Sequence, residues 1–171
     1  MDFQIKNGVL VKYTGQDTVV VIPDGVTAIG DGAFSRCEWI TSLALPESVA
    51  TIGDSAFSGC YRLASVNLPA GLREIRSFTF SYCTRLTALT IPEGCTAIGD
   101  SAFWACGYLR DITLPASVTE IHGDAFDEDA QVTIHAPAGS FAARWAEENG
   151  FKLVTDKQNR QIKDDAHRAS S

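Results

Sequence analysis

Four cysteines recur at a fixed interval, which makes them the first candidates for chemistry. Cys37, Cys60, Cys83 and Cys106 each lie 23 residues from the next. Thiols in such an array raise the question of disulfide formation or metal binding. Stacked neighbours rarely meet the dihedral requirement of a disulfide, and four ligands in a row cannot surround one ion. We therefore predict a column of buried free thiols that pack as small hydrophobes, with disulfides and metal binding as the alternatives.

Aspartates recur at the same interval. Asp31, Asp54 and Asp100 each stand shortly before an Ala-Phe pair. Stacked carboxylates could form a binding site, but an aspartate just before a helical turn usually accepts hydrogen bonds from the first N–H groups of that turn. We predict that these aspartates cap short helical turns.

A separate acidic group lies near a histidine. Asp124, Asp127, Glu128 and Asp129 follow His122 in the sequence. Their spacing lacks the ordered alternation of a calcium-binding loop. A solvated acidic turn is the favoured interpretation, with a weak calcium site as the alternative, and we predict no metal centre.

The sequence does not indicate an enzyme. Its three histidines, His122, His135 and His167, belong to no His-Glu-x-x-His motif. A phosphate-binding loop, a Gly-x-Ser-x-Gly motif and a dinucleotide fingerprint are also missing from the sequence. We predict a protein without catalytic residues and without a cofactor.

The 23-residue interval extends well beyond the cysteines and aspartates. Three further residue types keep it: Phe34, Phe57, Phe80, Phe103 and Phe126; Ile29, Ile52, Ile75, Ile98 and Ile121; and Pro23, Pro46, Pro69, Pro92 and Pro115. A strict period of this length indicates a solenoid, in which each repeat buries its apolar residues against its neighbours. These residues are therefore expected to pack the core rather than to carry function.

Each repeat is expected to contain two short extended segments and a turn. In the stretch 63–75, Val66 and Leu68 alternate with outward positions, and Pro69 ends this strand because proline cannot donate to a ladder. A second extended segment, 72–75, follows. Cys95 takes a position of this second segment that is valine in other repeats, so we expect it in the core. The glycine after the isoleucine is predicted to take a left-handed turn conformation.

Residues 1–154 are expected to form a single leucine-rich domain with a cap at each end. Residues 1–22 form the first cap, in which two extended segments flank Asn7-Gly8, a strong hairpin signal. Residues 23–136 hold about five repeats. Residues 137–154 form the second cap, where Ser140 begins a short amphipathic helix and Gly150 ends it. Residues 155–171 are polar and are expected to be a disordered tail, with a weakly docked helix as the alternative.

The repeated pattern resembles a known family. Leu-x-x-Val-x-Leu-Pro followed by Val-x-x-Ile-Gly-Asp-x-Ala-Phe-x-x-Cys is similar to the BspA-like leucine-rich repeat, and the stretches 7–15 and 136–140 resemble that family's caps. The resemblance implies an α/β-type leucine-rich repeat solenoid built mostly of short strands and turns. It implies a right-handed curved coil with a concave parallel sheet, an N-terminal β-hairpin cap and a C-terminal short-helix cap. It also implies a bacterial surface protein involved in adhesion and protein–protein contact, and it transfers no catalytic residues.

The fifth repeat departs from the pattern at residues 122–124, and the third repeat departs from it as well. The third repeat reads Arg76-Ser77-Phe78-Thr79-Phe80 where other repeats have Gly-Asp-x-Ala-Phe. Arg76 replaces the turn glycine, which puts the shared turn conformation in question there. Phe78 places a large apolar group at a position otherwise held by serine, glycine or aspartate. Arg76 and Phe78 are therefore secondary candidates for a binding surface.

Aromatic residues in the turns beside the cysteine column are the main candidates for binding. They do not follow the inward pattern of the repeat, and they are Trp39, Tyr61, Tyr82, Trp104 and Tyr108. Tryptophan and tyrosine are favoured anchors of protein interfaces, and an exposed aromatic stripe is rare on a monomer without a use. We predict a partner-binding edge, with packing along the flank of the solenoid as the alternative.

These residues predict a non-catalytic module that binds a protein partner, of an adhesion type. A carbohydrate-binding module is an alternative because exposed aromatic rings also stack on sugars, so a glycan is the second class of partner. A structural spacer within a longer surface protein is the other alternative.

Charge and hydropathy narrow the classes of partner that we expect. The net charge is −7 and no cluster of lysine and arginine offsets it, so we expect no binding to nucleic acid. The longest strongly apolar run, residues 19–22, is too short to span a bilayer, so no membrane insertion is expected. The N-terminus lacks the order of a secretory signal. The family resemblance implies the cell surface or secretion, whereas a complete chain without a signal would be cytoplasmic.

Overall fold

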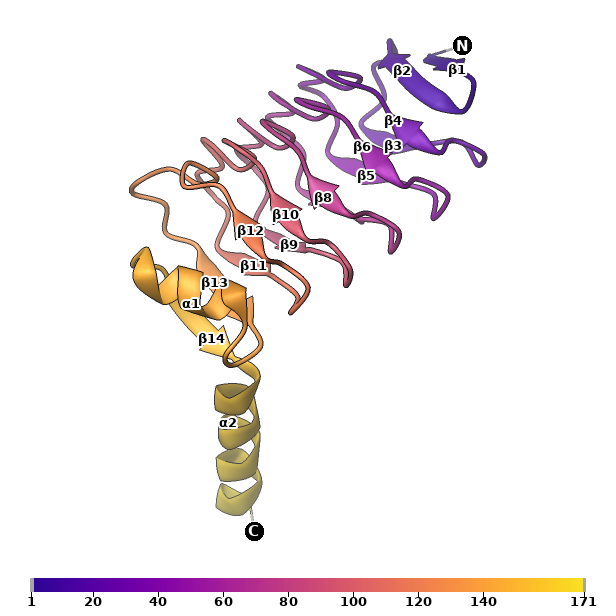
Figure 1. Ribbon diagram of the computed structural model, residues 1–171. Helices are drawn as coiled ribbons and strands as arrows, with labels where there is room; N and C mark the ends of the chain where they lie inside the picture. The colour runs from indigo at the N-terminus through magenta and orange to yellow at the C-terminus, as the bar shows by residue number, and fades with distance from the viewer. Residues whose placement is uncertain (1, 171) are drawn as a thin grey trace.

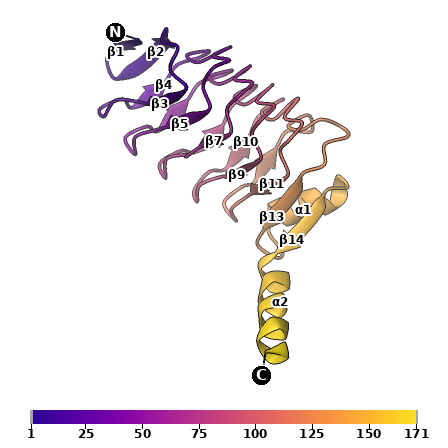
Figure 2. The same cartoon turned by 180° about the vertical axis from the view of Figure 1, so that it is seen from behind.

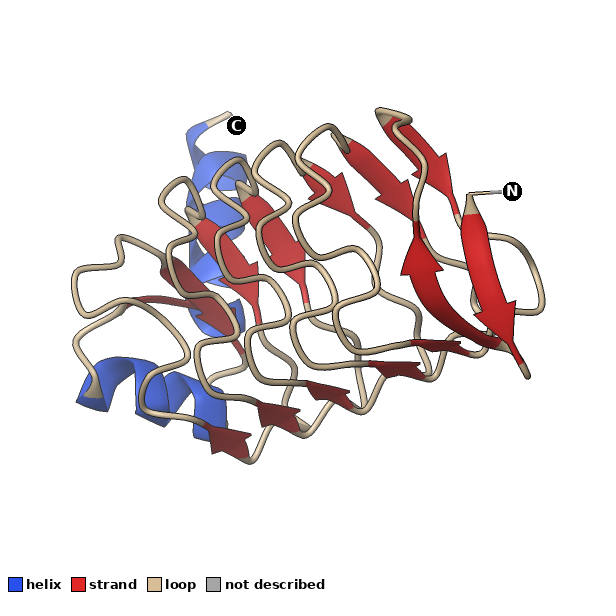
Figure 3. Ribbon diagram, turned by 90° about the horizontal axis from the view of Figure 1, so that it is seen from above, coloured by secondary structure: helices blue, strands red, loops and turns tan. Residues whose placement is uncertain are grey.

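The computed structural model describes residues 2–170 as a β-solenoid with a cap at each end (Figure 1). Each 23-residue repeat makes one turn of the coil, and we number the repeats 1 to 5 by their phenylalanines, Phe34, Phe57, Phe80, Phe103 and Phe126. Figure 3 shows two rows of short strands on different sides of the coil, joined by loops. The first row comprises β2 (Val9–Tyr13), β4 (Ala28–Ile29), β6 (Thr51–Ile52), β8 (Glu74–Ile75), β10 (Ala97–Ile98) and β12 (Glu120–Ile121). The second row comprises β3 (Val19–Val21), β5 (Ser42–Ala44), β7 (Ser65–Val66), β9 (Ala88–Thr90), β11 (Asp111–Thr113), β13 (Thr133–Ala136) and β14 (Lys152–Thr155).

Strands of neighbouring repeats pair in parallel, so that equivalent residues lie side by side. Ile98 of β10 pairs with Ile75 of β8, and Leu43 of β5 pairs with Val66 of β7. This register places the same residue type at the same height in successive repeats. The result confirms the predicted solenoid with parallel sheets.

Both rows of strands are interrupted at the same level, between repeats 2 and 3. One sheet ends at β6 and the next begins at β8, while on the other side one sheet ends at β7 and the next begins at β9. Along the turns the contact is continuous, because the N–H of Phe57 donates to the carbonyl of Thr79 at 2.9 Å. We call this interruption the seam.

The core is a continuous column of aromatic rings. The ring centroids of the five repeat phenylalanines are 5.3–5.7 Å apart. Phe34, Phe57 and Phe80 are fully buried. Tyr13 stacks on the first ring from the N-terminal cap, and Trp145 packs on the last from the C-terminal cap. Burial of these rings supplies a large share of the hydrophobic stabilisation.

The cysteines lie in a second buried column, as predicted, and all are free thiols. The Sγ of Cys60, Cys83 and Cys106 donates to the backbone carbonyl of the phenylalanine one repeat before, at 3.1–3.2 Å. Cys95 is also buried, as expected. The column ends in repeat 5, where Asp129 takes the cysteine position and is exposed to solvent.

The turn after the first-row strand differs from the prediction in where its left-handed residue lies. Gly30, Gly53 and Gly99 do not have positive φ; that conformation occurs two positions later, at Gly32, Ser55, Phe78 and Ser101. Repeat 3 therefore has the same turn conformation as repeats 1, 2 and 4, because Phe78 has φ 58°. Glycine is needed for close approach instead, because a Cβ on Gly99 would lie 2.9 Å from the backbone of Arg76.

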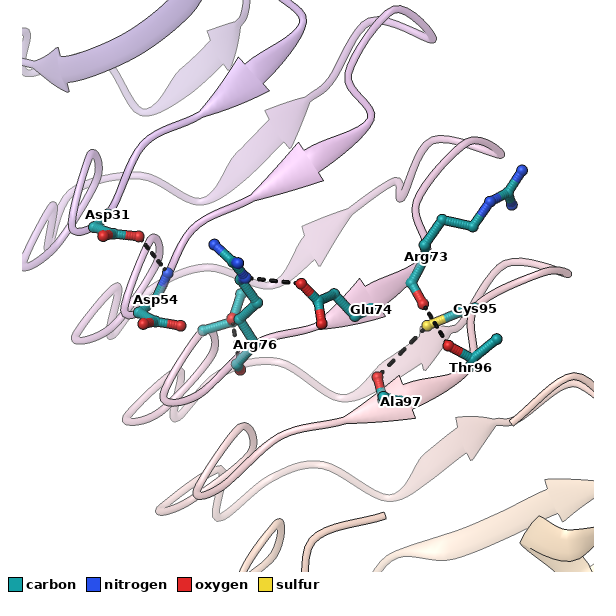
Figure 4. A network of polar contacts seen from close by, with 9 residues as sticks. Asp31, Asp54, Arg73, Glu74, Arg76, Cys95, Thr96 and Ala97 are labelled. Atoms are coloured by element: carbon teal, nitrogen blue, oxygen red, sulfur yellow. Dashed lines mark hydrogen bonds and ion pairs between the residues drawn. The ribbon is translucent and has the colours of Figure 1, made fainter. Parts of the chain in front are cut away.

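The prediction that the repeated aspartates cap helical turns is also wrong. The segments that follow them are turns rather than helices. The carboxylate of Asp31 accepts the N–H of Asp54, one repeat further along, at 2.8 Å (Figure 4). Asp100 accepts the hydroxyl of Ser101 at 2.8 Å.

The N-terminal cap is the expected hairpin. β1 (Phe3–Lys6) pairs antiparallel with β2, and Asn7 and Gly8, both with positive φ, form the turn between them. β2 then continues in parallel with β4, so the hairpin covers the open end of that row.

The C-terminal cap contains helix α1 (Phe141–Glu148), as expected. The Ser140 hydroxyl accepts the N–H of Ala143 at 3.1 Å, and Gly150 follows the helix with positive φ. Trp145 and three alanines of α1 are buried against the last repeat. Residues 156–169 form helix α2 (Asp156–Ala169) rather than a disordered tail, and none of its described residues is buried. In Figures 1 and 2, α2 extends away from the coil.

Candidate functional site

The turns that follow the first-row strands bring aromatic residues of repeats 3 and 4 to the surface. Phe78 and Tyr82 have φ of 58° and 59°, and both residues are exposed to solvent. The N–H of Phe78 donates to the backbone carbonyl of Asp100 at 2.9 Å, and the N–H of Tyr82 donates to the backbone carbonyl of Trp104 at 2.8 Å. These bonds hold the turn of repeat 3 against the turn of repeat 4, so Tyr82 lies beside Trp104.

Five residues line a shallow hollow of about 370 Å³ on this surface, and we call it the aromatic hollow. It is formed by Phe78, Tyr82, Ser101, Trp104 and Asp124. The three aromatic side chains are 36–48% exposed, which is unusual for rings of this size. Two of them, Tyr82 and Trp104, belong to the predicted binding edge, and Phe78 was a secondary candidate.

The other residues of the predicted edge lie in different surroundings. Trp39 packs against the core, and its buried indole N–H has no hydrogen-bond partner among residues 2–170. Tyr61 is 39% exposed but does not line the aromatic hollow. Tyr108 is exposed, and the guanidinium groups of Arg85 and Arg110 lie 5.3 and 5.9 Å from its ring centroid. The structure thus gathers only part of the edge into one site.

Arg76, the remaining secondary candidate, lies outside the aromatic hollow. Its Nε donates to a carboxylate oxygen of Glu74 at 2.8 Å (Figure 4). Both side chains are about half exposed, so this ion pair contributes little to stability.

Acidic groups lie at one end of the aromatic hollow. Asp100, His122 and Asp124 place one potential ligand atom each within 4.8 Å of one another. The His122 Nδ1 lies 3.8 Å from the Asp100 carboxylate and accepts the backbone N–H of Asp124 at 3.1 Å. The Asp124 carboxylate has no ion pair within residues 2–170, although it is exposed. This end of the hollow therefore carries uncompensated negative charge.

The acidic run considered as a calcium site is not brought together. Both carboxylate oxygens of Asp127 accept the N–H of Ala105 at 3.0 Å, which ties this side chain to the preceding repeat. Asp124 instead approaches Asp100 and His122.

The spacing of three residues in the sequence already indicates part of the aromatic hollow. Phe78, Ser101 and Asp124 are 23 residues apart and so occupy one repeat position. A column of this kind must lie along one line on the surface. Aligning the outward positions of the repeats would have placed Asp124 beside the aromatic candidates.

A second hollow lies where the second-row strands meet α2. It measures about 310 Å³ and is lined mainly by small and apolar residues, among them Pro92, Pro115 and Pro137. Two acidic residues, Glu93 and Asp156, line it. The Asp156 carboxylate is already engaged, because it accepts the N–H of Ala138 at 2.9 Å. That hydrogen bond is the main reason why the pKa of Asp156 lies below its ordinary value. This hollow has no exposed aromatic anchor, so the aromatic hollow is the stronger candidate.

Comparison with known proteins identifies the repeat. Residues 9–133 match the model of the BspA type leucine rich repeat region, in six copies. The chain belongs to the BspA-type leucine-rich repeat family. The match contains one copy more than the five repeats expected from the phenylalanines.

Solved structures agree with this assignment. A leucine-rich repeat protein of T. pallidum is 36% identical, with a TM-score of 0.73 over 78% of this chain and 68% of that protein. A leucine-rich cell surface protein of Faecalibacterium prausnitzii is 29% identical, with a TM-score of 0.72 over 89% of this chain but only 37% of that protein. The pneumococcal vaccine antigen PcpA, at 18% identity and a TM-score of 0.72, shares the fold over 90% of this chain and 45% of its own length.

No match was found among curated proteins. Neither helix within residues 2–170 is long and apolar enough to cross a membrane.

Proposed function

We propose that this BspA-type repeat module is non-catalytic and binds a protein partner through the aromatic hollow, in an adhesion-type role. The carrying observation is that three exposed aromatic residues, all departures from the repeat pattern, meet in one hollow. Phe78 stands where other repeats have a small or acidic residue. Tyr82 stands where they have non-aromatic residues, and Trp104 stands where they have serine or aspartate. Such residues do not serve the shared packing of the coil, and Trp and Tyr are frequent anchors of interfaces.

The rigid scaffold supports this role. The turns of repeats 3 and 4 are hydrogen-bonded to each other through the backbone, so the backbone that carries the rings is fixed before a partner arrives. Less entropy is then lost on binding. A place at the bacterial cell surface is part of the proposal, and it is supported by the printed description of the F. prausnitzii relative as a cell surface protein.

The test compares two double variants in binding to surface-protein extracts. Tyr82→Ser with Trp104→Ser removes two rings of the hollow. Val19→Ser with Val21→Ser is the matched control, because these valines are 63% and 67% exposed on β3. We expect the first variant to lose binding by about tenfold or more and the control to retain it. Equal binding by both variants would show that the hollow is not the interface.

A carbohydrate-binding module is the second candidate, favoured by the same exposed rings. A glycan array decides between the two: specific glycan binding that Trp104→Ser abolishes would replace a protein with a glycan as the partner. A spacer role predicts that neither double variant changes binding.

A further inference from the structure

We propose that the aromatic hollow receives a cationic side chain, lysine or arginine, from the partner protein. This inference rests on the proposed function, because it names the chemistry that the partner presents to the same site. Two separate features support it: the aromatic faces in the hollow and the acidic groups at its end.

The rings of the hollow have no cation of their own. The faces of aromatic rings attract positive charge through their quadrupole. Within residues 2–170, the guanidinium groups that lie over rings are both at Tyr108, where Arg85 and Arg110 fill that role. Phe78, Tyr82 and Trp104 remain without such a contact, although they are 36–48% exposed. Tyr108 thus has cationic groups of the same chain over its ring, whereas the three rings of the aromatic hollow have none within residues 2–170.

The acidic end supplies the charge that complements a cation. Asp124 lines the hollow and forms no ion pair within the described chain. Asp100 lies close by; its carboxylate accepts the Ser101 hydroxyl at 2.8 Å and lies 3.8 Å from the His122 Nδ1. Two carboxylates in proximity repel each other, so a positive charge placed between the rings and Asp124 is favoured. The negative net charge of the chain adds long-range attraction for a basic partner.

Other occupants fit these groups less well. An apolar side chain would desolvate the Asp124 carboxylate without giving it a partner, which is costly. A metal ion bound to Asp100, Asp124 and the His122 Nδ1 would displace the N–H of Asp124, which that nitrogen already accepts at 3.1 Å. A lysine or arginine side chain needs only the carboxylate and the ring faces.

The experiment follows the indole N–H of Trp104 by NMR during titration with short peptides. The probes are acetyl-Gly-Lys-Gly-amide and acetyl-Gly-Arg-Gly-amide, and the neutral controls carry acetyl-lysine and citrulline at the central position. The Trp104 signal is assigned by its loss in Trp104→Ser. We expect it to shift with saturation in the millimolar range for the cationic peptides. We expect the neutral peptides to bind at least about threefold more weakly.

Two variants test the contributions of the site. Asp124→Asn should weaken binding of the cationic peptides by about two- to fivefold and leave the neutral peptides unaffected. Tyr82→Ser should weaken it by about threefold or more. Asp164→Asn on the exposed helix α2 is the control, because it changes the net charge equally and lies far along the chain from the hollow. It should leave the affinity unchanged.

The outcomes separate this inference from the proposed function. Equal affinity for cationic and neutral peptides, or an Asp124→Asn variant that behaves as Asp164→Asn does, overturns the cationic occupant. If the partner nevertheless depends on Tyr82 and Trp104, the proposed function stands with a different occupant. If trimethyllysine or choline binds and lysine and arginine peptides do not, the occupant is a quaternary ammonium group and the inference fails.

Discussion

At the scale of single residues, burial decides the chemistry of the cysteines. Removal from water raises the pKa of the Cys60 and Cys106 thiols to about 12, and that of Cys83 lies well above its ordinary value for the same reason. A thiol rather than a thiolate is therefore present at neutral pH, and it donates to a backbone carbonyl. Thiolates are the nucleophiles and metal ligands, so this column is chemically inert while the protein is folded.

The first prediction concerns stability at alkaline pH. The folded-state pKa of Cys60 and Cys106 lies above the ordinary value of 9.0, so their contribution to stability is fully present below pH 9. As the pH rises toward 12, the unfolded chain releases protons that the folded chain keeps, and the free energy of unfolding falls by about 1.4 kcal/mol per pH unit for each thiol. Denaturant titrations of wild type and of Cys60→Ala with Cys106→Ala should show a shallower decline in the variant. Parallel declines would contradict this assignment.

The second prediction compares two phenylalanines of one turn. Phe80 is fully buried in the aromatic column, so Phe80→Ala should lower the free energy of unfolding by about 3–5 kcal/mol by opening a cavity. Phe78 is 43% exposed, so Phe78→Ala should lower it by less than about 1 kcal/mol. Chemical denaturation followed by circular dichroism measures both. Equal losses would mean that Phe78 also packs the core.

At the scale of elements, close backbone contact shapes the turn. Glycine is retained where one repeat approaches the next, and positive φ is carried by serine and phenylalanine as well as by glycine. The sequence suggested that this glycine itself takes the left-handed conformation, because glycine is the residue usually associated with left-handed turns. Contacts between repeats are not visible in the local sequence.

The third prediction tests this role of glycine. A Cβ at Gly99 would lie 2.9 Å from backbone atoms of Arg76 and Ser77, whereas a Cβ at Gly107 would meet nothing within 4 Å. Neither residue has positive φ. Gly99→Ala should therefore destabilise by more than about 1 kcal/mol, and Gly107→Ala by less than about 0.5 kcal/mol. Thermal unfolding of the two variants checks the difference; similar midpoints would remove the argument from close approach.

The fourth prediction concerns the seam. The N–H groups of Thr96 and Gly99 donate to Arg73 and Ile75 of the repeat before, at 2.8 and 2.7 Å. Within residues 2–170, the equivalent N–H groups of Arg73 and Arg76 donate to no backbone carbonyl. Hydrogen exchange should therefore be about tenfold faster or more at Arg73 and Arg76 than at Thr96 and Gly99. Equal protection at all four amides would show that the two halves of the sheets are joined in solution.

At the scale of the whole molecule, the caps close a core that would otherwise be open at both ends. Tyr13 covers the first phenylalanine, and Trp145 and Phe151 cover the last. Repeat proteins depend on such ends because each repeat contacts only its neighbours. Helix α2 differs, since it begins with a capping box at Thr155 and Gln158 but buries none of its described residues.

The fifth prediction separates the two helices. Deletion of residues 159–171 should change the free energy of unfolding by less than about 0.5 kcal/mol, because these side chains cover no core. Deletion of residues 137–171 removes α1 and exposes Phe126, and this shorter chain should aggregate or fail to fold. Circular dichroism and size-exclusion chromatography distinguish the two results. A large loss on the shorter deletion would show that α2 is part of the cap.

The sequence by itself determined the solenoid, its period, its hairpin and helix caps, and the buried thiols. The reason is that residues one period apart in a solenoid lie side by side, so a repeated residue type reports its own surroundings. Phe57 has Phe34 and Phe80 as neighbours in the sequence pattern and in the ring column alike.

The period alone places Phe78, Ser101 and Asp124 in one column, but only the tertiary structure decided that Tyr82 and Trp104 lie beside it. Tyr82 and Trp104 lie one residue short of a full period apart, and Asp124 lies two periods after Phe78. Their convergence depends on how the turns of neighbouring repeats stack, which the backbone hydrogen bonds between repeats 3 and 4 fix. Trp39 and Tyr108 were equally plausible from sequence, but Trp39 is partly buried against the core, and the guanidinium groups of Arg85 and Arg110 lie over the ring of Tyr108. The aromatic hollow exists because side-chain direction and contacts between repeats are set by the folded backbone.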